Sequence, residues 1–141
     1  RIFVVDASPF AESENDELAD ENLKLLKGFK KVFINPIIEI ESGKKWLFSE
    51  GCLSIPGIRE DVERKPFIKI SYFDENWNYH ESNYDGIAAR IIQHEYDHIE
   101  GVLFTDHLKP LKRRLLKRKL DDISKGKVDV DYKMKFPNLK R

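Results

Sequence analysis

The chain has 141 residues, enough for one domain around a single hydrophobic core. Basic and acidic residues number 25 each, so the net charge indicates no particular class of charged partner. The only cysteine, Cys52, cannot form an internal disulfide, which excludes a disulfide-stapled secreted scaffold and favours the cytoplasm. The sequence shows neither a signal peptide nor an apolar run near the ~20 residues that span a bilayer.

The first two thirds of the chain predicts β-structure. Ser8-Pro9 ends the first apolar run, and Pro56-Gly57 predicts a loop. Residues 7–28 are expected to form a solvated acidic insertion, because six acidic residues and no basic one lie between positions 12 and 21. Short runs rich in β-branched and aromatic residues predict strands at residues 2–5, 32–34, 37–40, 46–48, 67–73 and 79–84.

Helical spacing replaces this pattern after residue 85. The helical spacing is followed by Ile87, Ile91, His94, Glu95 and His98. Asp85 is the predicted N-cap and Gly101 the predicted stop. A second helix is expected over residues 110–125. Because the strands come first and the helices last, the sequence predicts one α+β domain over residues 1–141.

The first helix carries a metal-binding pattern. Residues 94–98, His-Glu-Tyr-Asp-His, fit H-E-x-x-H, and side chains four apart on a helix lie about 40° apart around its axis. His94 and His98 can therefore share one ion. Glu95 lies about 100° from His94 around the axis, where it can reach a water without ligating the metal.

Two imidazoles need a third ligand, which the spacing does not fix. Phe104 stands where the metzincin pattern needs a histidine, so that pattern fails. Asp121 and Asp122 are weak candidates at the distance typical of thermolysin-like enzymes, and His107 is another. Cys52 also remains a candidate.

Two separated motifs together resemble the peptide deformylase family. That family carries E-G-C-L-S and Q-H-E-x-D-H, which here are residues 50–54 and 93–98 without substitution. The likeness continues through Ile55-Pro56, Arg59 and Asp85-Gly86 to residues 101–104 and into the last helix. The resemblance predicts antiparallel strands packed around the metal-binding helix, with a basic helix at the C-terminus.

One family motif, G-x-G-x-A-A-x-Q, is missing before Arg1. Its glutamine helps to hold the oxyanion in the family. Because the sequence begins with arginine and its only methionine is Met134, we expect that an N-terminal segment is missing. These 141 residues alone would then lack one oxyanion donor, a loss that typically costs about 10²–10³ in turnover.

The resemblance implies a metal-dependent hydrolase that removes the N-formyl group from the initiator methionine of new polypeptides and releases formate. Cys52, His94 and His98 would ligate the metal, Glu95 would be the general base, and the Leu53 N–H would bind the oxyanion. One thiolate and two imidazoles leave a position for water, the pattern of a catalytic site. The family implies Fe²⁺ in the cell, with Zn²⁺, Ni²⁺ or Co²⁺ as other occupants.

Further residues have predicted supporting roles. Arg59 is expected to contact the peptide beside Gly51, and Ile87 and Ile91 are candidates for the wall of a methionine slot, with core packing as the alternative. Gln93 is expected to support the ligands, unless it is an ordinary surface glutamine. Glu50 and Arg64 are expected to pair and brace the cysteine loop.

Two rival functions remain open. A metallopeptidase would use the same Glu95 but needs an extended cleft on both sides of the scissile bond. A binding module with a structural zinc would need a fourth protein ligand, which His80 or His107 would have to supply.

The C-terminal helix is a predicted docking surface for the ribosome. Residues 109–125 contain eight basic and two acidic residues, for a net charge of +6. Leu111, Leu115 and Leu116 are expected to face the core. An exposed basic helix attracts a polyanion such as ribosomal RNA; the alternative is a solvated surface helix. The residues expected to face outward are Lys112, Arg113, Lys117 and Lys119.

Overall fold

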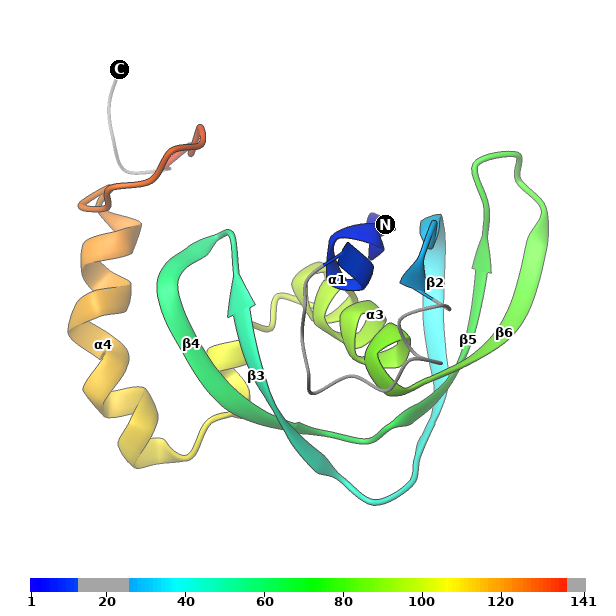
Figure 1. Ribbon diagram of the computed structural model, residues 1–141, viewed down its shortest axis with the longest axis horizontal. Helices are drawn as coiled ribbons and strands as arrows, with labels where there is room; N and C mark the ends of the chain where they lie inside the picture. The colour runs from blue at the N-terminus through cyan, green and yellow to red at the C-terminus, as the bar shows by residue number, and fades with distance from the viewer. Residues whose placement is uncertain (13–25, 137–141) are drawn as a thin grey trace. The chain divides into compact units, whose positions relative to one another are not determined.

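The computed structural model describes residues 1–12 and 26–136, and Figure 1 labels most of their helices and strands. The chain divides into two compact units: residues 1–46 with 64–103, and residues 47–63 with 104–141. Antiparallel strands come first and the long helices last, which confirms the predicted α+β class. No helix in the described ranges is long and apolar enough to cross a membrane.

The first unit is a four-stranded antiparallel sheet covered by a helix. Its strands lie in the order β1-β2-β5-β6. Phe3, Phe33 and Tyr72 are buried in its core, with the Phe3 and Phe33 rings stacked 4.7 Å apart. Helix α3 contacts β1, β5 and β6. The strands are β1 (Ile2–Asp6), β2 (Lys30–Ser42), β5 (Phe67–Phe73) and β6 (Tyr79–Asp85), and the helices are α1 (Ser8–Glu12) and α3 (Gly86–Ile99).

Strand β2 corrects the prediction of two separate strands at 32–34 and 37–40. The chain passes through Asn35-Pro36 without leaving the sheet, because the pairing with β5 shifts register between Ile34 and Ile37. Asn35 adopts a positive φ of 48° at this point. Such an irregularity accommodates a proline that cannot donate to the ladder.

Strand β1 ends at Asp6, before Ser8-Pro9, as the sequence predicted, and the short helix α1 follows it. Pro9 is the second residue of the helix, a position that tolerates the missing N–H. The Asp6 carboxylate accepts a 3.0 Å hydrogen bond from the Ser8 N–H. Most of the predicted acidic insertion, residues 13–25, lies outside the described residues. At its described ends, Ala7 and Leu26 are buried, whereas Pro9 and Lys27 are exposed.

The second unit contains a hairpin and the C-terminal helix. Its elements are β3 (Trp46–Cys52), β4 (Ile55–Arg64), the 3₁₀ helix η1 (Phe104–His107) and α4 (Pro110–Ser124); Trp46 and Arg64 belong to the first unit. Strand β4 runs through the loop predicted at Pro56-Gly57. Gly57 lies within the strand at a φ of +67°, which glycine adopts without steric cost. Six residues form the core: Ile55, Ile58, Val62, Phe104, Leu108 and Ile123.

The apolar face of α4 differs from the prediction. Leu116 and Leu120 pack against this core and Ile123 belongs to it. Leu111 and Leu115, which were expected to face inward, are 69% and 74% exposed. The helix is rotated from the predicted orientation because positions 116, 120 and 123 follow a single i, i+4, i+7 stripe.

Candidate active site

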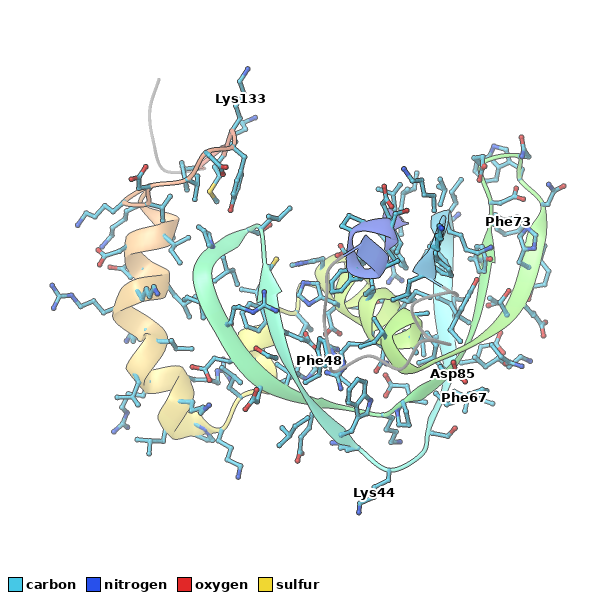
Figure 2. All side chains as sticks on the ribbon, viewed as in Figure 1. Lys44, Phe48, Phe67, Phe73, Asp85 and Lys133 are labelled. Atoms are coloured by element: carbon cyan, nitrogen blue, oxygen red, sulfur yellow. The ribbon has the colours of Figure 1, made fainter. Side chains whose placement is uncertain are left out.

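Helix α3 carries the H-E-x-x-H residues and is defined at both ends. Phe67 pairs with Asp85 at the end of the sheet, and Asp85 leads directly into the helix (Figure 2). Asp85 occupies the predicted N-cap position with extended backbone angles, although its side chain makes no capping hydrogen bond. Gly101, with a φ of +75°, follows the last turn, and its N–H donates to the His98 carbonyl. The histidines therefore lie in the last two turns of the helix.

His94 and His98 lie on one side of α3, as their spacing predicts. Their ring centroids are 5.0 Å apart, and the ring planes are inclined by 83°. Both side chains are half-buried, and so is Glu95 between them in sequence. Two imidazoles on one partly shielded helix face fit the nitrogen ligands of a transition-metal ion.

Gln93 is buried, which argues against the alternative of a surface glutamine. Its side-chain amide donates hydrogen bonds of 3.1 Å to the carbonyls of Lys65 and Ala89. The bond to Lys65 joins α3 to the chain segment just before β5. Gln93 thus fixes the helix at the residue that precedes the first histidine, which fits its predicted supporting role.

Two buried arginines hold the same helix, and sequence reasoning missed the partners of both. Arg64 donates a 2.7 Å hydrogen bond to the Asp97 carboxylate. Arg90 donates to the Trp46 carbonyl at 2.9 Å, with its guanidinium 4.3 Å from the centroid of the Trp46 ring. The acid of the Q-H-E-x-D-H motif was the available signal for Asp97. The predicted pairing of Arg64 with Glu50, which is buried, stays a prediction.

In the second unit, the E-G-C-L-S residues form the end of a hairpin. Cys52 is the last residue of β3, and Leu53 and Ser54 alone connect it to β4. The Cys52 side chain is partly buried against the core of this unit. Leu53 is 76% exposed. The hairpin therefore presents the thiol beside a backbone turn that is open to solvent.

Arg59 and Gly51 are brought together across this hairpin. A Cβ atom at Gly51 would lie 3.2 Å from an Arg59 guanidinium nitrogen and 3.3 Å from its Cγ. The Arg59 guanidinium donates a 3.1 Å hydrogen bond to the Ser49 carbonyl. A larger residue at position 51 would therefore require the Arg59 side chain to shift by a few tenths of an ångström.

The two isoleucines predicted to line a methionine slot differ in burial. Ile87 is 2% exposed in the core of the first unit, which favours core packing for this residue. Ile91 is half-buried and stays a candidate for the wall.

His80 and His107, the histidines proposed as a fourth ligand of a structural zinc, lie in β6 and in η1. His80 pairs with the Asp74 carboxylate at 2.9 Å in the turn between β5 and β6, and His107 is exposed in η1. The hydrogen bond from His80 and those from Asn78 and Asn76 lower the pKa of Asp74, although partial burial opposes the shift. His80 thus has a role in a surface turn.

Comparison with known proteins identifies the class of enzyme to which this helix and hairpin belong. Residues 1–114 match the family model described as polypeptide deformylase. The peptide deformylase of Christiangramia forsetii is 60% identical over 141 residues, which are the whole of this chain and 71% of that protein. A peptide deformylase structure from Plasmodium falciparum has a TM-score of 0.68 at 35% identity, over 89% of this chain and 66% of its own.

The chain belongs to the polypeptide deformylase family, an enzyme family. The structure of a mutant of Arabidopsis thaliana peptide deformylase 1B is also similar, with a TM-score of 0.69 at 32% identity over 89% of this chain. The chain spans 61% of that structure and 66% of the Plasmodium falciparum structure, less than two thirds of each.

Proposed function

We propose that the complete protein removes the N-formyl group from the initiator methionine of newly made polypeptides and releases formate. The observation that carries this proposal is the pair of imidazoles, 5.0 Å apart on α3, in a chain of the polypeptide deformylase family. Formyl transfer to water needs an activated water, a base and an oxyanion donor, and the two motifs supply candidates for each.

We propose Cys52, His94 and His98 as the ligands of one divalent ion. A thiolate and two imidazoles suit Fe²⁺, Zn²⁺, Ni²⁺ or Co²⁺, and we propose Fe²⁺ as the ion used in the cell. When bound, the ion supplies Lewis acidity that makes water an effective nucleophile near neutral pH. Proteins with substitutions at these positions test the ligand set. Cys52→Ala or His98→Ala in the complete protein should lose stoichiometric metal, and retention would refute the assignment.

The residues around the ion are assigned complementary tasks. Glu95 takes a proton from water while the water oxygen attacks the formyl carbon. Glu95 then delivers that proton to the methionine nitrogen when the C–N bond breaks. The Leu53 N–H donates to the oxygen of the formyl group as negative charge develops there. Arg59 contacts the peptide backbone, and Ile91 lines the methionine slot.

Formate release from a formyl-methionyl peptide tests the function directly. The complete, metal-loaded protein should release one formate per peptide and leave every internal peptide bond intact. Mass spectrometry of the products separates the metallopeptidase alternative, which predicts internal cleavage without formate.

We also propose that α4 docks on the ribosome, in the cytoplasm where nascent chains are made. The structure modifies the expected surface: Lys112 pairs with Glu60, Arg113 pairs with Asp106, and Lys119 donates to the Gly57 carbonyl. These bonds hold α4 within its own unit. The exposed basic residues Arg114, Lys117 and Arg118 are therefore the better candidates for contact with RNA.

Charge reversal at these three residues tests docking. A variant with glutamate at positions 114, 117 and 118 should co-sediment less with ribosomes and keep its turnover on a short peptide. The matched control reverses the exposed lysines Lys27, Lys44 and Lys45 in the first unit. Equal co-sedimentation of wild type and the α4 variant at low salt would contradict docking and support the alternative, a solvated surface helix.

A further inference from the structure

The chain after α4 follows a defined path within the second unit. The N–H groups of Gly126 and Lys127 donate to the carbonyls of Ile123 and Asp122, both at 2.9 Å, and Gly126 has a φ of +74°. This arrangement ends the helix and turns the chain sharply. Val128 then packs against the hydrophobic core. The segment from Lys127 to Phe136, called the tail below, therefore starts from a fixed position.

The tail reaches the turn between β3 and β4. The Tyr132 hydroxyl donates a 2.8 Å hydrogen bond to the Leu53 carbonyl, across 79 positions in the sequence. This distance is typical of an O–H···O hydrogen bond. Tyr132 is 36% exposed, and Leu53, whose carbonyl it contacts, is 76% exposed.

The hydrogen bond from Tyr132 restrains the orientation of a peptide in the turn between β3 and β4. Two-residue hairpin connections normally place one or both residues at positive φ, and neither Leu53 nor Ser54 has a positive φ. The Leu53 carbonyl belongs to the peptide between these two residues. Common turn types differ mainly in the orientation of that peptide, so an external hydrogen bond selects one orientation.

We infer that Tyr132 is a positioning residue for the oxyanion site: its hydroxyl holds the Leu53–Ser54 peptide, and with it the orientation of the Leu53 N–H. This inference rests on the proposed function, in which that N–H donates to the developing oxyanion. The hydroxyl does not touch the reacting atoms. It restrains the backbone on the carbonyl side of Leu53. The Leu53 N–H is therefore less free to rotate away from the oxyanion.

A Tyr132→Phe variant of the complete, metal-loaded protein removes only the hydroxyl. The kcat for a short formyl-methionyl peptide should fall about three- to tenfold, the size expected for one neutral hydrogen bond. KM should stay unchanged, because the oxyanion forms only in the transition state. Metal content should also stay unchanged. Amide hydrogen exchange in the segment 52–55 should become faster, a readout that does not depend on activity.

Tyr79→Phe is the matched control. Tyr79 is also an exposed tyrosine whose hydroxyl donates a hydrogen bond, to Glu81 at 3.1 Å, but it lies on β6 in the first unit. This variant should keep the wild-type kcat and the wild-type exchange rate in segment 52–55. An equal fall in kcat for both variants would overturn the inference.

Other outcomes separate this inference from the proposed function. An active wild type with an unaltered Tyr132→Phe variant would overturn the positioning role alone. A fall in kcat that accompanies loss of metal would assign Tyr132 a purely structural role and also overturn it. A complete wild-type protein that releases no formate would overturn the proposed function, and the positioning role with it.

Discussion

The Arg64 guanidinium donates a 2.7 Å hydrogen bond to the carboxylate of Asp97, the residue immediately before His98 on α3. The Arg64 side chain is 4% exposed and the Asp97 side chain 18%. A buried charge pair in this position ties the last turn of the helix to the end of β4. The second histidine is therefore held by a contact that neither the H-E-x-x-H spacing nor helical periodicity reveals.

Removing Asp97 should destabilise the protein strongly. Asp97→Ala takes a carboxylate away from a buried arginine, and breaking such a pair typically costs about 3 kcal/mol or more. Urea denaturation of the complete protein measures the change in the free energy of unfolding. The control is Asp106→Ala, which breaks the exposed pair with Arg113 and should cost at most about 1 kcal/mol. Equal effects of the two substitutions would show that the Arg64–Asp97 pair does not stabilise the fold.

Gln93→Leu should weaken metal retention without touching a proposed ligand. The substitution leaves a branched apolar side chain, one atom shorter, and removes the amide that donates to the Lys65 carbonyl. Such supporting groups are typically worth about 10- to 100-fold in metal affinity. Competition with a chelator measures the affinity. A variant that holds its metal as tightly as wild type would limit Gln93 to a packing role.

Asp74 should make stability depend on pH at the acidic end. Its pKa lies below the usual value mainly because of the hydrogen bond with His80, so the ionised form is favoured in the folded protein. The stabilisation is complete above the unfolded pKa of about 3.9 and is lost as the pH falls through the lower folded value. The difference in melting temperature between wild type and Asp74→Ala should be largest at pH ~7 and should shrink below pH ~4. A constant difference over this range would contradict this linkage.

The sequence predicted those parts of the fold that depend on local patterns. The alternation in residues 67–73 and the helical spacing around His94 predicted strand β5 and helix α3, with Asp85 and Gly101 at the ends. The prediction divided β2 at Asn35-Pro36, because a bulge that keeps a proline within a sheet depends on the neighbouring strand. Strand β4 was missed at Pro56-Gly57 for a similar reason.

In the candidate site, too, local patterns were predictable and contacts between distant segments were not. His94 and His98 followed from spacing on one helix, and the resemblance to a family added Cys52 and Leu53. Contacts between distant segments were not predictable from local pattern: Arg64 with Asp97, and Tyr132 with Leu53. The orientation of α4 was misjudged because several leucine stripes are possible on a leucine-rich helix, and only the packed core selects the one through Leu116 and Leu120.

The central claim is that Glu95 is the base of a metal-dependent deformylation. The most direct measurement is formate release by the complete Glu95→Gln variant, with its metal content determined on the same sample. We predict stoichiometric metal and a turnover at least about 10²-fold below wild type, since glutamine keeps the shape of the side chain but cannot accept the proton. A Glu95→Gln protein that holds its metal and releases formate at the wild-type rate would contradict this role of Glu95.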